Sequence, residues 1–176
     1  MLNRLDLLRK IKAAAFLEGE FVTRAGKKTN YYIDKYLFET KPEILDAVTD
    51  GIKELLPPLD SFDRIGAPEL GAVALAALTA VKVNKPFLIV KKQSKDYGTQ
   101  RLIEGEFKPG ERIVVLEDVL TTGGAVLKAV DVLLANELKI VDIIGVINRE
   151  EGAFENINQK GFSVKALFNK TELFNS

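Results

Sequence analysis

Hydrophobic and polar positions alternate between helical and strand spacing along most of the chain. Leu5, Leu8, Ile11 and Ala15 recur on one helix face, which predicts an amphipathic helix near the N-terminus. Later apolar runs are short and bounded by charges, prolines or glycines, which indicates buried strands. The expected strands cover residues 31–36, 62–67, 86–90, 112–119, 139–147 and 162–168, and the later helices cover residues 41–56, 70–81, 123–136 and 154–159.

Strands that alternate with helices predict an α/β fold in which helices cover both faces of a mostly parallel sheet. Ligands of such sheets bind at the carboxyl ends of the strands. The sequence has no internal repeat and no low-complexity linker, so we expect one domain over residues 1–176. Residues 91–111 show no periodicity and follow a strand, which predicts a long loop at the ligand-binding edge.

The amino-acid composition excludes several kinds of catalytic chemistry and binding partner. The chain has 25 basic and 25 acidic side chains, and this zero net charge counts against a nucleic-acid partner. It has no Cys and no His, which excludes a thiolate nucleophile, an imidazole base and a zinc–thiolate site. Charges interrupt the N-terminus as they would not in a signal peptide, and the uncharged run 70–81 is too short to span a bilayer. We therefore expect a cytoplasmic protein with no membrane partner, whose chemistry uses carboxylates, lysines, arginines, hydroxyls and backbone dipoles.

The stretch "RIVVLEDVLTTGGAVL", residues 112–127, combines a strand, two acids and a turn rich in threonine and glycine. The turn opens a helix, whose unpaired N–H groups and positive dipole end attract an anion such as phosphate. Glycines let the backbone approach the phosphate closely. The simpler alternative is that Thr121 caps the helix and Gly123 relieves a tight turn. The sequence contains neither GxxxxGK[ST] nor GxGxxG after a strand, so we expect neither a nucleoside-triphosphate loop nor a dinucleotide site.

The segment "VVLEDVLTTGGA" resembles the signature of type I phosphoribosyltransferases for phosphoribosyl pyrophosphate (PRPP). The resemblance implies their fold, with a small N-terminal hood formed mainly by about residues 1–40. It also implies that Glu117 and Asp118 bind the ribose hydroxyls and favour positive charge on the sugar during catalysis. The 5-phosphate of PRPP would then bind the turn made of Thr121, Thr122, Gly123, Gly124 and Ala125.

Three further stretches resemble orotate phosphoribosyltransferases, so that the resemblance covers nearly the whole chain. "GEFVTRAGKKTNYYIDKY" is similar to the N-terminal segment of that family. The similarity implies that Arg24, Tyr32 and Ile33 bind orotate, together with Tyr31, for which core packing remains an equal alternative. "INREEG" is similar to a strand-end pair of the family, which implies that Arg149 binds the orotate carboxylate beside Thr121. A bidentate guanidinium suits a carboxylate.

The third stretch, "VKKQSKDYGTQRLIEG", resembles the catalytic loop of the family. The resemblance implies that Lys91, Lys92 and Tyr97 bind PRPP and that Lys95 is catalytic. The alternative is an ordinary solvated surface loop, but long loops without structure are uncommon unless they have a function. We therefore expect residues 93–104 to close over the pyrophosphate and to become ordered when PRPP binds.

Several positions depart from the family pattern. Lys91 and Tyr97 stand where many members have Arg and His, and Glu69–Leu70 stands where many have an aromatic residue and a lysine. Loss of that lysine removes one pyrophosphate contact, which leaves the role to Lys92 and Lys95 or weakens PRPP binding.

The resemblance implies the reaction of orotate with PRPP to give orotidine 5-phosphate and pyrophosphate, in the biosynthesis of pyrimidines. It implies Mg²⁺ as cofactor, held by few or no protein ligands, and a homodimer with shared active sites. Three alternatives stay open: a purine phosphoribosyltransferase, a regulator that senses PRPP, and an inactive relative with the same fold.

Overall fold

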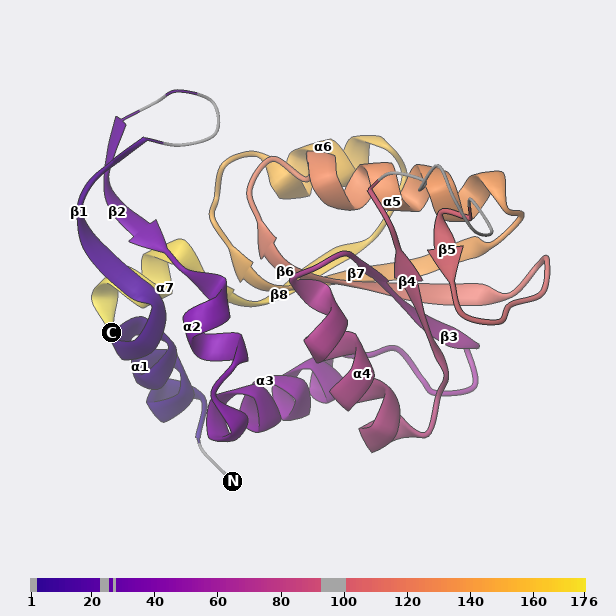
Figure 1. Cartoon of the computed structure of the whole chain (residues 1–176), viewed down its shortest axis with the longest axis horizontal. Coiled ribbons are helices and arrows are strands. Elements are labelled where there is room, and N and C mark those ends of the chain that lie inside the picture. Colours follow the sequence, from indigo (N-terminus) through magenta and orange to yellow (C-terminus); the bar gives the residue numbers. More distant parts are fainter. Residues whose placement is uncertain (1–2, 23–25, 27, 93–100) are drawn as a thin grey trace.

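The computed structural model describes residues 3–22, 26, 28–92 and 101–176 of the chain (Figure 1). In chain order the elements are α1 (Arg4–Ala15), β1 (Phe16–Val22), β2 (Lys28–Ile33), α2 (Lys35–Glu39), α3 (Pro42–Leu55), β3 (Arg64–Pro68), α4 (Ala72–Val83), β4 (Phe87–Val90), β5 (Ile103–Glu104), β6 (Arg112–Leu120), α5 (Gly124–Ala135), β7 (Lys139–Asn148), α6 (Ala153–Gln159), β8 (Val164–Asn169) and α7 (Lys170–Asn175).

A central sheet with the strand order β5-β4-β3-β6-β7-β8 organises the chain. All neighbouring strands are parallel except β5, which pairs antiparallel with β4. The winding runs from β3 outward to β4, and later from β6 in the opposite direction to β7 and β8. Strands β3 and β6 therefore lie side by side where the winding reverses, and such a switch point is where α/β sheets bind ligands. The predicted α/β fold with a mostly parallel sheet is confirmed.

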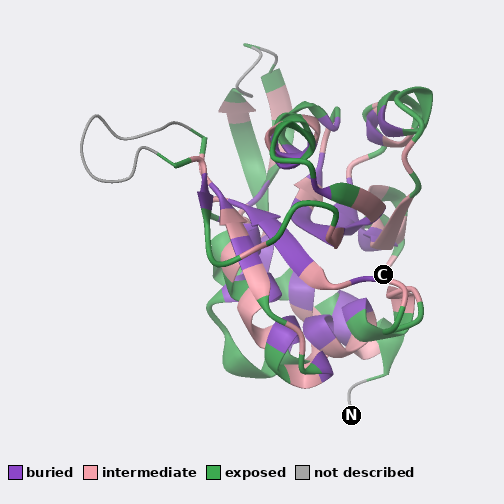
Figure 2. Cartoon of the chain, turned by 90° about the vertical axis from the view of Figure 1, so that its right-hand side faces the viewer, coloured by how far each residue is buried: buried purple, intermediate pink, exposed green. Residues whose placement is uncertain are grey.

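Helices cover both faces of this sheet, with α3 and α4 on one side and α5 and α6 on the other (Figure 1). Strand β6 shows how the two cores arise, because successive side chains of a strand point to opposite faces. Val114 and Leu116 belong to the cluster shared with α1 to α4, whereas Ile113 and Val115 belong to the cluster shared with α5 and α6. Buried residues concentrate in the strands and on the inner helix faces (Figure 2). No described helix is both long and apolar enough to cross a membrane.

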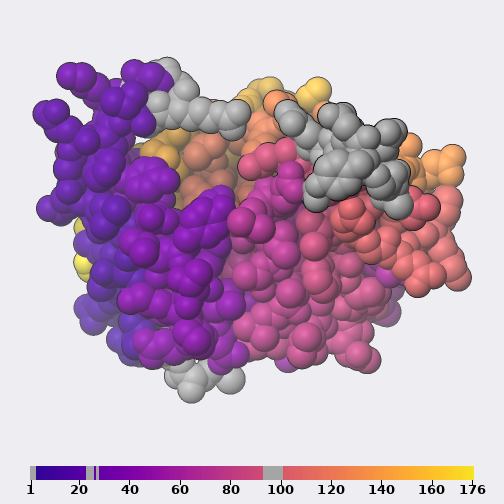
Figure 3. Space-filling model, in the orientation of Figure 1, coloured from indigo at the N-terminus to yellow at the C-terminus, as the bar shows by residue number. Residues whose placement is uncertain are grey.

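The N-terminal elements and the C-terminal helix pack together beside the sheet. Strands β1 and β2 form an antiparallel hairpin that projects from the body of the molecule (Figure 3). The rings of Phe16 and Tyr31 stack at a centroid distance of 5.6 Å, and Phe174 of α7 meets each of them edge-on at 5.1 Å. An aromatic cluster thus joins the hairpin to the end of the chain.

Four features differ from the sequence-based expectation. The predicted strand 31–36 ends at Ile33, because the Asp34 side chain accepts a hydrogen bond from the Tyr36 N–H at 3.2 Å and caps α2. Strand β1 was not predicted, since most of its side chains are exposed and it has no apolar face to reveal it. Helix α7 was also missed. The long loop predicted over residues 91–111 contains the short strand β5.

Helix α2 depends on one buried aromatic ring for its position, and this dependence can be tested. Phe38 is fully buried among the residues of the first core cluster. We expect Phe38→Ala to lower the free energy of unfolding by about 3–5 kcal/mol, because it leaves a cavity in a packed core. Urea unfolding followed by far-ultraviolet circular dichroism measures the loss.

A matched control is Leu59→Ala, because Leu59 is 45% exposed. It should change the free energy of unfolding by less than about 0.5 kcal/mol. Equal losses in the two variants would contradict the anchoring role of Phe38.

Candidate active site

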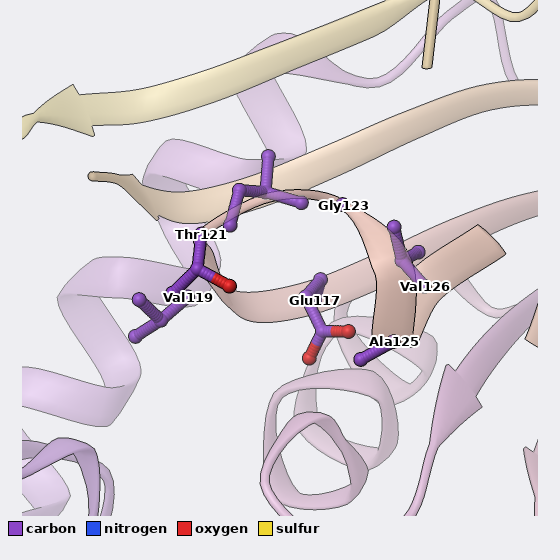
Figure 4. A pocket seen from close by; sticks show the side chains of 7 residues that line it. Glu117, Val119, Thr121, Gly123, Ala125 and Val126 are labelled. Atoms are coloured by element: carbon purple, nitrogen blue, oxygen red, sulfur yellow. The ribbon is translucent and has the colours of Figure 1, made fainter. Parts of the chain in front are cut away.

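The two acids predicted to bind ribose lie near the carboxyl end of β6, at the switch point of the sheet. Strand alternation sends their side chains in different directions. Glu117 lines a small pocket with Thr121, Gly123 and Ala125 of the following turn (Figure 4). The Asp118 carboxylate instead lies against Gly71 and the ammonium group of Lys35. The sequence suggested one acidic pair, and the structure shows two acids with different surroundings.

The turn after β6 has the geometry of an anion site. Gly123 adopts a positive φ of 80°, and helix α5 begins at the next residue. A Cβ atom on Gly123 would lie 3.3 Å from the Ala153 carbonyl oxygen, so the turn is tight as well as left-handed. The Asn156 side chain donates a hydrogen bond to the Thr122 carbonyl oxygen at 2.9 Å and braces the turn. The first N–H groups of α5, which no helical carbonyl can accept, are therefore presented by a fixed backbone.

The Asp118 carboxylate is held from three sides. Its Oδ1 accepts a hydrogen bond from the Val119 N–H at 2.5 Å, and its Oδ2 accepts one from Lys35 Nζ. A Cβ atom on Gly71 would lie 1.5 Å from Oδ2, so only glycine leaves room for the carboxylate there. Lys35 begins α2, Gly71 precedes α4, and Asp118 lies in the sheet. Three elements that are distant in sequence thus converge on one carboxylate.

Burial and mutual repulsion set the charges around this carboxylate. Burial, and then the negative charge of Asp118, raises the pKa of Glu117 well above its ordinary value. Burial and the charge of Asp118 also raise the pKa of Glu39 to about 8. Burial opposes the charge of Lys35, yet attraction to Asp118 holds the pKa of Lys35 above its ordinary value. In the described part of the chain, Glu39 Oε1 and Glu117 Oε2 are buried without a hydrogen-bond partner. Glu39 is therefore mostly protonated at pH 7, and Glu117 keeps its proton to a higher pH than an ordinary glutamate does.

Arg149 follows the end of β7 and lies next to the turn, because its N–H donates to the Leu120 carbonyl oxygen at 2.8 Å. Its guanidinium donates to the Tyr31 hydroxyl at 3.3 Å and pairs with Glu151 at 2.9 Å. Its Nε is buried and has no hydrogen-bond partner among the described residues. A buried guanidinium with a donor to spare suits a carboxylate ligand.

The other predicted orotate residues lie on opposite faces of β2. Tyr32 is 47% exposed and its ring lies 5.5 Å from that of Phe21. Ile33 is buried in the first core cluster, on the same side as Tyr31. Tyr31 packs in the aromatic cluster, as the core-packing alternative expects, and its hydroxyl also accepts a hydrogen bond from Arg149.

The structure describes some of the residues predicted to bind the pyrophosphate part of PRPP. Lys91 Nζ pairs with Glu104 at 2.6 Å, and the Lys92 N–H donates to Glu69 Oε1 at 2.7 Å. Glu69, which departs from the family pattern, thus anchors the start of the predicted loop. The predicted site residues Arg24, Lys95 and Tyr97 lie outside the described residues, as does most of the predicted lid.

Lys35, Glu39 and Gly71 were not singled out from the sequence. The available signal was the spacing of Lys35 and Glu39, which places them on one face of a helix. That signal was hidden because residues 31–36 were interpreted as a strand. Gly71 becomes informative only when its distance to Asp118 is known.

Comparison with known proteins places these features in a family. Residues 38–171 match the model of the phosphoribosyl transferase domain. The chain belongs to this phosphoribosyltransferase family. It is 42% identical to an orotate phosphoribosyltransferase of Pyrococcus abyssi, over 89% of this chain and 86% of the relative.

Solved structures agree with this assignment. The orotate phosphoribosyltransferase of Aeropyrum pernix is 26% identical and superposes with a TM-score of 0.86, over 98% of this chain and 97% of that one. UMP synthase of Leishmania donovani is 25% identical with a TM-score of 0.87, over 99% of this chain but only 38% of that one.

The raised pKa of Glu39 predicts a specific dependence of stability on pH. Folded Glu39 keeps its proton up to about pH 8, whereas in the unfolded chain it ionises near its ordinary pKa of 4.5. Stability is therefore lost as pH rises between these values, and Glu39→Gln removes this loss. We expect the variant's advantage in free energy of unfolding to grow with pH, by up to about 1.4 kcal/mol per pH unit.

Urea unfolding at several pH values, without substrates, measures this advantage. The control is Glu43→Gln, because Glu43 has a 65% exposed side chain in an ion pair with Lys10. Its profile should run parallel to that of the wild type. A parallel profile for Glu39→Gln would show that Glu39 titrates normally.

Proposed function

We propose that the protein is an orotate phosphoribosyltransferase, which transfers the phosphoribosyl group of PRPP to orotate in pyrimidine biosynthesis. The observation that carries this proposal is Arg149, whose buried Nε has no partner in the described structure and which adjoins the Thr–Gly turn. Orotate offers the carboxylate that such a guanidinium needs. The name and 42% identity of the Pyrococcus abyssi relative support the same substrate. The whole chain acts in this proposal as one catalytic domain.

The proposed mechanism needs no protein nucleophile, which suits a chain without Cys or His. The turn from Thr121 to Ala125 binds the 5-phosphate of PRPP, and Asp118 and Glu117 face the ribose. As the bond to pyrophosphate breaks, positive charge develops on the sugar, and nearby carboxyl groups stabilise it. Lys91, Lys92, Lys95 and Tyr97 face the departing pyrophosphate. Binding both substrates in line lowers the entropic part of the barrier.

Mg²⁺ is the proposed cofactor. In the described part of the chain no group of three or more acidic side chains is arranged to hold a metal ion. The donors that fit Mg²⁺ are instead the phosphate and hydroxyl oxygens of PRPP, since this ion keeps several waters and needs few protein ligands. When bound, it would neutralise charge on the leaving pyrophosphate.

Substrate choice tests the proposed function. We expect turnover of orotate to exceed that of uracil by several orders of magnitude, because uracil leaves the buried Nε of Arg149 without an acceptor. Release of pyrophosphate from PRPP with Mg²⁺ is measured for orotate, uracil, adenine, guanine and xanthine. Arg149→Gln should abolish most of the preference for orotate over uracil.

Arg9, an exposed arginine of α1, provides the control variant Arg9→Gln, which should keep the preference. Faster use of a purine would support the purine alternative, and no turnover of any base would support a regulator or an inactive relative. Either result would overturn the proposed function.

We further propose a homodimer in which Lys95 of one subunit serves the site that contains Asp118 of the other. Lys95→Ala and Asp118→Asn, each nearly inactive alone, should then restore about a quarter of wild-type activity when mixed in equal amounts. Half of the randomly paired dimers are mixed, and each of these has one intact site. Pyrophosphate release measures the recovery, and mass spectrometry verifies subunit exchange. Exchange without recovery would show that each lysine serves its own subunit.

A further inference from the structure

We propose that Lys35 is a positioning residue for PRPP: from helix α2 it holds the Asp118 carboxylate in the orientation that binds the ribose hydroxyls. This inference rests on the proposed role of Asp118. Lys35 does not follow the acid pair or the phosphate turn in sequence. It reaches them because α2 packs beside the switch point between β3 and β6.

The geometry fixes the carboxylate at both oxygens. Asp118 Oδ1 accepts the Val119 N–H, and Oδ2 accepts Lys35 Nζ, while Gly71 closes the third side. A carboxylate has about four acceptor positions, so two remain for hydroxyl donors of a sugar. The Asp118 side chain is 3% exposed, whereas that of Lys35 is 31% exposed. The lysine therefore forms the solvent-facing side of the contact.

The charge balance explains why an ammonium is needed there. The carboxyl groups of Glu117 and Glu39 lie close enough to Asp118 that its charge raises the pKa of both. Lys35 attracts Asp118 directly and also opposes the repulsion felt by Glu39. Without this cation, Asp118 would face two carboxyl groups with no compensating charge, and its side chain would be free to turn away from Gly71.

A second lysine–aspartate pair provides an internal comparison. Asp142 Oδ1 accepts the Ile143 N–H at 3.0 Å, and its Oδ2 accepts Lys165 Nζ at 2.5 Å. The pattern matches that of Asp118, including a nearly buried carboxylate and a partly exposed lysine. Asp142, however, lies in the first half of β7, away from the carboxyl ends of the strands. A purely structural ion pair in this sheet should therefore behave like Lys165–Asp142.

The test compares Lys35→Met with Lys165→Met, and includes Lys35→Arg, Lys35→Gln and Asp118→Asn. Dissociation constants for PRPP with Mg²⁺ are measured by calorimetry, KM values are measured for both substrates, and thermal melting reports the fold of each variant. We expect Lys35→Met to weaken PRPP binding on the order of tenfold or more, because it leaves a buried charge unpaired. The KM for orotate should stay within about twofold, since Arg149 follows a different strand, β7, and makes no contact with Lys35 among the described interactions. Lys35→Gln keeps a hydrogen-bond donor but removes the charge, and it replaces Lys35→Met in the comparison if Lys35→Met does not fold.

Rescue by Lys35→Arg, with wild-type PRPP binding in Lys165→Met, would support the positioning role. Weak PRPP binding in Asp118→Asn but wild-type binding in the Lys35 variants would overturn this inference and leave the proposed function standing. Wild-type PRPP binding in Asp118→Asn would overturn the role of Asp118 and the inference with it. Equal weakening in Lys165→Met would reduce Lys35 to a general contributor to stability.

Discussion

The reversal of winding between β3 and β6 is the constraint on which the candidate site depends. It brings the loop after β3 and the turn after β6 to the same edge of the sheet, because β3 and β6 are neighbouring parallel strands. Gly71 and Asp118 can then approach so closely that a single methyl group would not fit. The phosphate turn, the acids and Arg149 are local consequences of strand ends, but their meeting point is set by the order of the strands.

At this point of the structure one ammonium group, that of Lys35, contacts Asp118 and also acts electrostatically on the buried carboxyl groups of Glu117 and Glu39. A group of this kind cannot be fully ionised without a large cost in desolvation and repulsion. The raised pKa values of Glu39 and Glu117 favour their protonated forms, which lowers that cost, and Lys35 balances the charge of Asp118. The acids near the sugar site are thus unequal: Asp118 is held in place by Lys35 and the Val119 N–H, whereas Glu117 lies beside the turn with a raised pKa.

The features that the sequence revealed are those carried by contiguous residues. The strand, acids, threonines and glycines of residues 112–125 specify their own local geometry, so both the strand and the turn were predicted correctly. Helix α2 could not be predicted in the same way, because its five residues are too few to show a helical period and Asp34 ends a strand-like run. Because α2 was not predicted, Lys35 and Glu39 were not predicted as site residues either. The faces of β2 were also hidden, since Tyr32 and Ile33 are adjacent and only packing decides which one enters the core.

Through the aromatic cluster, helix α7 affects the position of Arg149 in the candidate active site. Phe174 packs on Phe16 and Tyr31, and the hydroxyl of Tyr31 accepts a hydrogen bond from Arg149. Lys12 of α1 also donates to the carbonyl oxygens of Phe174 and Ser176. The orientation of the guanidinium is therefore linked mechanically to α7. An affinity tag fused directly after Ser176 would disturb the packing of Phe174 on Tyr31 and, through Tyr31, the position of Arg149. A tag for purification is therefore better placed at a site remote from α7.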